Sequence, residues 1–138
     1  MPFTYQSATR DFEAYLDGLR TISGLATRNQ CYTMTRSVFL VFRAHVAAQA
    51  AMDFAQFLPA VLRAIFIEEW DLDAPVTPFP AAAVLSAEVR AIREAHNFST
   101  PTAISEVAEA LRHAMKPEDH AAMLAKLPAE AARFWTTA

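Results

Sequence analysis

The sequence predicts an all-α fold, an eight-helix bundle made of two similar four-helix halves. Apolar residues recur at helical spacing along most of the chain, and glycine occurs only twice. The pairs Leu58-Pro59 and Leu127-Pro128 are separated by half the length of the 138-residue chain, and each precedes an apolar stretch that ends in tryptophan, Trp70 or Trp135. A repeat of half the chain length is typical of an internally duplicated helical unit.

Displacing the sequence by half its length aligns similar residues at several positions, and the alignment needs no gap from about Cys31 to Phe66. The aligned pairs include Val38 with Val107, Phe42 with Leu111, Arg43 with Arg112, Phe54 with Met123 and Phe66 with Trp135. We expect a single domain, 1–138, with one repeat at about 9–70, a linker at about 71–79 and a second repeat at about 80–136. The two halves are expected to face each other about a pseudo-twofold axis and to share one apolar interior.

The first half divides into four predicted helices. The first spans about 9–22 and ends at Gly24, a residue that suits a helix C-terminus. The second opens at Thr27, which forms a capping-box pattern with Gln30, and extends to about residue 46. A third helix is expected at about 50–57 and a fourth at about 59–69, because Pro59 ends one helix and suits the start of the next.

The second half repeats this plan after a linker that contains Pro75, Pro78 and Pro80. Prolines so closely spaced forbid helix and favour an extended path. Thr100 is expected to be an N-cap followed by Pro101 at the first helical position. The four predicted helices lie at about 81–95, 101–115, 117–126 and 128–135.

Composition and charge exclude several classes of partner. Hydrophobic residues make up 54% of the chain, the net charge is −3 and the isoelectric point is about 5.8. The absence of a cluster of Lys and Arg argues against binding to nucleic acid or to an anionic membrane surface. The longest strongly apolar run is Val38 to Phe42, and residues 1–11 hold no secretory segment. We therefore expect a cytoplasmic protein.

The sequence offers few candidates for catalysis or metal binding. Cys31 is the single cysteine, so it cannot form an internal disulfide. Arg28 and the helix N-terminus would lower its thiol pKa, but no histidine is near in sequence, and a buried core position is expected. His113 and His120 flank Pro117 and would need a third ligand such as Asp119 to hold a metal. No cofactor, metal or catalytic residue is predicted.

Two sets of side chains are candidates for contacts with other molecules. Arg36 and Arg43 share a face of the second helix and Arg112 repeats Arg43, so these residues either pack by their stems, pair between the halves or contact an anion. Phe66, Trp70 and Trp135 are candidate interface residues. Trp70 lies in an acidic, proline-flanked segment, where it either anchors a partner or fills the gap between the halves.

The order and doubling of the aromatic and Leu-Pro motifs resemble a bacterial family of small cytoplasmic proteins, the domain of unknown function 2267. The residues that carry this resemblance are Phe57-Leu58-Pro59, Leu62-Arg63, Ile65-Phe66, Trp70 with the proline linker, Lys126-Leu127-Pro128 and Phe134-Trp135. The resemblance covers nearly the whole chain. Glu69 departs from the pattern, because the family often has Gly before the tryptophan. The resemblance implies a duplicated helical fold and no activity, since the family offers no established catalytic or binding residues.

Three functions remain open from the residues. The first is a non-enzymatic interaction module that acts as a homodimer or through a protein partner. The second is a small-ligand binder with a cleft between the halves, which a cavity with converging Arg43 and Arg112 would favour. The third is an enzyme of unknown class, which a buried carboxylate beside His113 would favour.

Overall fold

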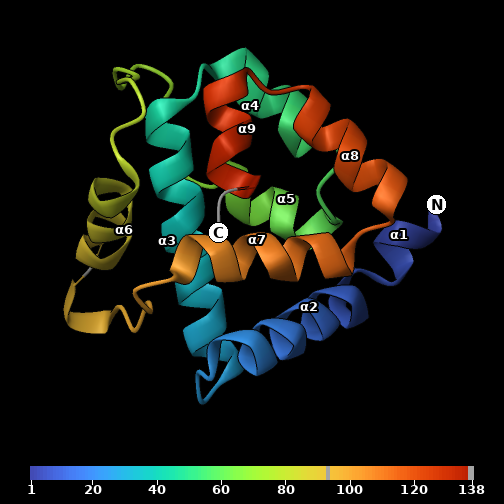
Figure 1. The fold of residues 1–138 in the computed structure, drawn as a ribbon. Coiled ribbons are helices and arrows are strands. Elements are labelled where there is room, and N and C mark those ends of the chain that lie inside the picture. The colour runs from blue at the N-terminus through green and yellow to red at the C-terminus, as the bar shows by residue number, and fades with distance from the viewer. Residues whose placement is uncertain (93, 137–138) are drawn as a thin grey trace.

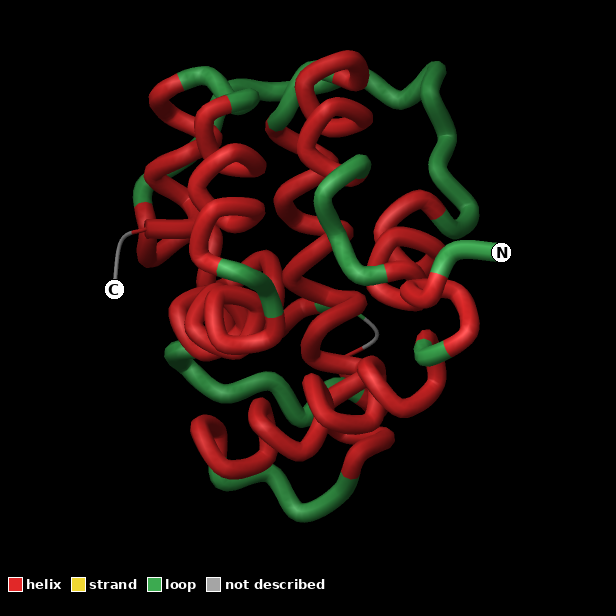
Figure 2. The backbone as a smooth tube through the Cα atoms, turned by 90° about the vertical axis from the view of Figure 1, so that its right-hand side faces the viewer, coloured by secondary structure: helices red, strands yellow, loops and turns green. Residues whose placement is uncertain are grey.

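Residues 1–92 and 94–136 are described by a computed structural model, and this part of the chain consists of helices and loops without a strand (Figures 1 and 2). The prediction of an all-α fold is confirmed. The helices are α1 (Phe3–Gln6), α2 (Ala8–Ser23), α3 (Arg28–His45), α4 (Ala48–Ala55), α5 (Ala60–Ile67), α6 (Ala82–Ala91), a 3₁₀ turn η1 (Glu94–His96), α7 (Ala103–Ala114), α8 (Pro117–Ala125) and α9 (Ala129–Thr136).

Local sequence signals account for three of the helix ends. Gly24 adopts a left-handed φ of 77° and its N–H donates to Arg20 O at 2.9 Å, which ends α2. At the start of α3 the Gln30 N–H donates to Thr27 Oγ1 at 3.1 Å, and the Thr27 N–H donates to Gln30 Oε1 at 3.3 Å. The predicted capping box is therefore present, and Pro117 occupies the first turn of α8 as predicted.

The prediction of Thr100 as the N-cap before Pro101 is wrong. Helix α7 begins at Ala103 after Thr102, and the hydroxyls of both threonines donate to the carboxylate of Glu106. Thr102 therefore occupies the N-cap position, without a capping hydrogen bond from its side chain.

Several helix boundaries recur after half the chain length. Helix α3 ends at His45 and α7 at Ala114, and α4 begins at Ala48 and α8 at Pro117. Helices α5 and α9 have the same length, and their first residues are separated by the same interval. The repeat is less regular at its start, because residues 24–27 join α2 to α3 whereas 92–102, including η1, join α6 to α7.

The helices of the two predicted repeats are interleaved. Helix α7 crosses the middle of the molecule, where it lies along α2 and also contacts α3 (Figure 1). Helix α6 packs on α3, and α4 packs on α8. The first helix of each repeat thus contacts the second helix of the other, and the buried apolar residues form one cluster drawn from both repeats.

An aromatic cluster forms the centre of this core. Phe42 is fully buried, and its ring lies 5.1–6.2 Å from five other rings. These rings belong to Phe54, Phe66, Phe79, Phe134 and Trp135. Edge-to-face and tilted contacts at such distances add to the hydrophobic stabilisation of each ring. Residues from α3, α4, α5, α9 and the linker meet here, so the cluster joins the two repeats.

Glu69 occupies a tight turn after α5 with a left-handed φ of 53°. A side chain in this conformation costs roughly 1 kcal/mol, because Cβ approaches the following carbonyl oxygen. We expect Glu69→Gly to raise the free energy of unfolding by about 1 kcal/mol in urea denaturation. The lost contact between Arg36 and Glu69, at 3.7 Å, is solvent-exposed on the Glu69 side and offsets little of this gain. Glu68→Gly, at a φ of −61°, is the control and should lower stability.

Candidate interaction groove

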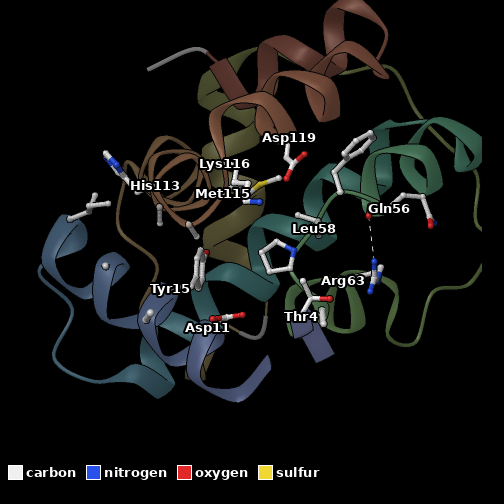
Figure 3. A pocket seen from close by; sticks show the side chains of 18 of the residues that line it. Thr4, Asp11, Tyr15, Gln56, Leu58, Arg63, His113, Met115, Lys116 and Asp119 are labelled. Carbon is white, nitrogen blue, oxygen red and sulfur yellow. Dashed lines mark hydrogen bonds between the residues drawn. The ribbon is translucent and has the colours of Figure 1, made fainter. Parts of the chain in front are cut away.

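A groove of about 900 Å³ lies between α2, the turn that joins α4 to α5, and the junction of α7 and α8 (Figure 3). Both repeats contribute to it, because the first supplies α2 and the Leu58-Pro59 turn and the second supplies residues 110–119. The groove thus runs along the place where the two repeats meet.

Small side chains on two neighbouring helices create the hollow. Ala14 and Gly18 lie one turn apart on α2, and Ala110 and Ala114 lie one turn apart on α7. A Cβ atom built on Gly18 would meet no other atom within 4 Å, so this position faces open space. A long side chain at the exposed Gly18 would fill the groove without entering the core, whereas Ala110 belongs to the core.

The floor of the groove is apolar and uncharged. Leu58 and Tyr15 are buried there, and Ile22, Phe57 and Met115 are half-buried around them. The Thr35 hydroxyl donates to Cys31 O at 2.9 Å, so it accepts the hydrogen bond from the Tyr15 hydroxyl at 2.8 Å. Burial raises the pKa of Tyr15 far above its usual value, and the hydrogen bond to Thr35 opposes this only in part.

Because Tyr15 is buried in its protonated form, we expect the folded chain to lose stability at high pH. Above pH about 10 the unfolded chain releases the Tyr15 proton while the folded chain keeps it. The free energy of unfolding should then fall with rising pH, by up to about 1.4 kcal/mol per pH unit from this group. Urea denaturation from pH 8 to 12 measures the slope, and Tyr15→Phe is the comparison. Identical slopes for the two proteins would contradict the prediction.

Charged side chains of both signs surround the floor. Asp11 accepts a hydrogen bond from Ser7 Oγ at 2.7 Å, and Arg63 donates to Gln56 O at 3.4 Å. Lys116 and Asp119 line the α8 side, and neither forms an ion pair with another described residue within 4 Å. Figure 3 shows Asp119 and Asp11 on opposite sides of the groove. An apolar floor with unpaired charges around it is suited to binding an amphipathic segment.

A family model described as an uncharacterised conserved protein, DUF2267, matches residues 12–134. The chain belongs to this family. The resemblance seen in the motifs is thereby confirmed. No protein of curated function matches the sequence significantly. Among the described residues, no helix is both long enough and apolar enough to cross a bilayer.

The predicted anion contacts do not form one site in this DUF2267 chain. Arg43 is 7% exposed, donates through Nη1 to Phe66 O at 3.1 Å and Glu68 O at 3.0 Å, and stacks on the Trp70 ring at 4.8 Å. Burial lowers the pKa of Arg43, and nearby Arg36 acts in the same direction. Arg112 instead lines a separate hollow of about 430 Å³ with His120. Arg43 is thus engaged at the C-terminal end of α5, and it does not converge with Arg112.

The three predicted interface residues have different environments. Phe66 and Trp135 lie in the aromatic core, so neither is available to a partner while the chain keeps this fold. This corrects the expectation for both, because the apolar stretches that end in tryptophan turn inward. Trp70 is half-buried, packs edge-on against Phe66 at 5.8 Å and carries Arg43 on its face. Its main contacts are therefore within the chain.

Cys31 and the histidines do not form the sites considered from sequence. Cys31 is buried, which confirms the expected core position, and this burial raises its thiol pKa instead of the lowering that Arg28 and the helix N-terminus suggested. Arg28 turns away to Asp17 and Glu13, with contacts of 2.8–2.9 Å. His113 lies 3.6 Å from Glu109 in an exposed pair. No group of three or more His, Cys, Asp or Glu side chains in the described ranges is placed to hold a metal ion.

A polar cluster around the buried His45 was missed from sequence. The Thr77 N–H donates to Ala44 O at 3.1 Å, and the His45 Nδ1 lies 3.0 Å from the Thr77 hydroxyl and 3.1 Å from its carbonyl oxygen. Nε2 lies 2.9 Å from the carboxylate of Glu88 on α6. The cluster ties α3, the linker and α6 together. Its partners are far from His45 in sequence, so no local pattern points to it.

Proposed function

We propose that the protein is a non-enzymatic interaction module of the cytoplasm, which binds a polypeptide segment in the groove between its repeats. The observation that carries this proposal is the groove itself, with its apolar floor around Leu58 and with Lys116 and Asp119, which form no ion pair in the part of the chain that the structure describes. An apolar centre with a polar rim is the usual anatomy of a protein interface.

The shape of the groove supports a polypeptide as the ligand. It is bordered by helices α2 and α7, whose small residues allow another backbone to approach closely. Amphipathic segments bind such grooves with an apolar face on the floor and charged residues at the rim. A partner chain or a second copy of this chain would both satisfy this chemistry.

Photo-crosslinking from the groove tests the proposal. A photoreactive benzoyl-phenylalanine at Ala14 is expected to give a protein adduct in cells that produce the variant, identified by mass spectrometry. Adding Gly18→Gln should abolish the adduct because the longer side chain fills the groove, whereas Gly18→Ala should leave it. The proposal fails if the probe at Ala14 gives the same adducts as a probe at exposed Leu72, or if Gly18→Gln changes nothing.

We also propose that the two repeats are related by an approximate twofold axis. This is supported by the reciprocal packing of α2 on α7 and α6 on α3, and by the contacts of α3 with α7 and of α4 with α8. Superposition of 28–67 on 97–136 in an experimental structure tests this. Failure of α4 and α5 to superimpose on α8 and α9 would refute it.

A small ligand with an apolar body is the second candidate, and a specific hollow favours it. A cavity of about 370 Å³ lies between α6, the start of α7 and α9. Its walls include Phe79, Leu85, Ile104 and Phe134, with Arg133 among the lining residues. A small aromatic carboxylate such as benzoate should raise the melting temperature if this site binds, since a ligand that binds only the native state stabilises it. The Arg133→Gln variant is the control and should show a smaller shift; no shift in the unmodified chain would exclude this ligand.

A further inference from the structure

Helix α1 exposes two aromatic side chains that the described part of the chain does not cover. Phe3 is 69% exposed and Tyr5 is 52% exposed, and no residue of α1 is buried. A large aromatic side chain buries much apolar area when a partner covers it, and this short helix exposes two such side chains. Covering α1 would therefore release substantial hydrophobic free energy.

This projecting helix adjoins the groove. Thr4, between the two aromatic residues, lines the groove together with Arg63 (Figure 3). The projection and the hollow thus lie on one face of the molecule. A twofold axis near α1 would bring the projection of each copy onto the hollow of the other, which is the condition for a closed, self-complementary interface.

The projection carries a cation, Arg10, and the groove carries the carboxylate of Asp119 together with the cations Arg63 and Lys116. The Arg10 guanidinium lies 5.9 Å from the centre of the Phe3 ring, and Arg10 forms no ion pair within 4 Å in the described ranges. When Phe3 lies on the floor of a partner's groove, Arg10 enters the groove with it. There Arg10 can form an ion pair with Asp119, which has no ion-pair partner among the described residues of its own chain. Arg63 and Lys116 then have the Tyr5 ring as a surface for a cation–π contact.

We propose that two copies of the chain pair about a twofold axis, each placing Phe3 and Tyr5 in the groove of the other. This inference rests on the proposed function and names its partner as a second copy. It assigns a role to α1, which makes few contacts in its own chain and is held by the Ser7 hydroxyl, 3.0 Å from Phe3 O.

Two variants separate the projection from the hollow. Phe3→Ser with Tyr5→Ser removes the projection, and Gly18→Gln fills the hollow; all three positions are exposed, so the fold should persist in circular dichroism. In sedimentation velocity the unmodified chain should dimerise, and each variant alone should dimerise roughly a hundredfold more weakly. Phe98→Ser, at another exposed aromatic, and Gly18→Ala are the controls and should dimerise as the unmodified chain does.

A mixture of the two variants tests most directly whether the projection of one chain enters the groove of the other. The projection of the Gly18→Gln chain still fits the open groove of the Phe3→Ser/Tyr5→Ser chain, so the mixture should form a heterodimer tighter than either homodimer. If the unmodified chain dimerises and neither variant weakens the dimer, the chain self-associates through another surface, and the role proposed for α1 is wrong. A monomeric unmodified chain would overturn the inference outright, and adducts from the Ala14 probe to another protein would then still support the proposed groove.

Discussion

Phe42→Ala should lower the free energy of unfolding by about 3–5 kcal/mol, the range for truncating a buried phenylalanine. Phe42 is fully enclosed by five aromatic rings drawn from both repeats. The cavity left by its ring cannot close without moving α5 and α9 together. Urea denaturation followed by circular dichroism measures the loss, and both repeats should unfold in the same transition.

The control for this variant is Phe98→Ala, which removes an exposed ring and should change stability by no more than about 0.5 kcal/mol. A Phe42→Ala protein as stable as this control would contradict the described core. Two separate transitions would contradict the sharing of the core between the repeats.

Arg43→Met should lower the free energy of unfolding by about 2 kcal/mol, within the range for losing hydrogen bonds donated by a charged group. The substitution leaves the carbonyl oxygens of Phe66 and Glu68 without their donor, and it removes the cation from the face of Trp70. The thioether replaces only the packing of the arginine stem. Urea denaturation followed by tryptophan fluorescence reports both the stability and the environment of Trp70.

The repeat supplies the matched control. Arg112 is the sequence counterpart of Arg43, but it lies on the surface, so Arg112→Met should cost less than about 0.5 kcal/mol. If both substitutions lowered the free energy of unfolding equally, the contacts of Arg43 would contribute no more to stability than those of a surface arginine. Arg43→Lys should recover only part of the loss, because an ammonium lacks the planar face that stacks on the indole.

Local physical chemistry made most of the fold predictable. The capping box at Thr27, the left-handed Gly24 and the prolines mark helix ends through interactions within a few residues, and the apolar stripes identify the faces that pack. The helix boundaries follow the sequence at these signals, whereas the helix predicted at about 81–95 ends at Ala91. Helix α1 escaped prediction because it is very short, buries no side chain and shows no apolar stripe.

A cleft between the halves was among the predicted alternatives, but the residues of the groove were not predicted, because they come together through contacts between distant segments. The groove arises where α2 lies on α7, and the alanines and Gly18 that form it are indistinguishable in sequence from ordinary helix residues. Some aromatic residues, in contrast, were predicted at an interface although they lie in the core. Trp135 resembles an interface anchor by its position, yet its ring stacks on Phe54 at 5.4 Å inside the core.

Methyl NMR spectra of the purified chain at increasing concentration test the interaction face most directly. The methyl groups of Ala14, Ile22, Ala114 and Met115 line the groove and should shift progressively as the second copy covers them. The methyl groups of Met52 and Leu72, which are exposed elsewhere, should stay constant. Shifts at Met52 and Leu72 with none at the groove would contradict the assignment of this face, and spectra that never change would contradict pairing between copies.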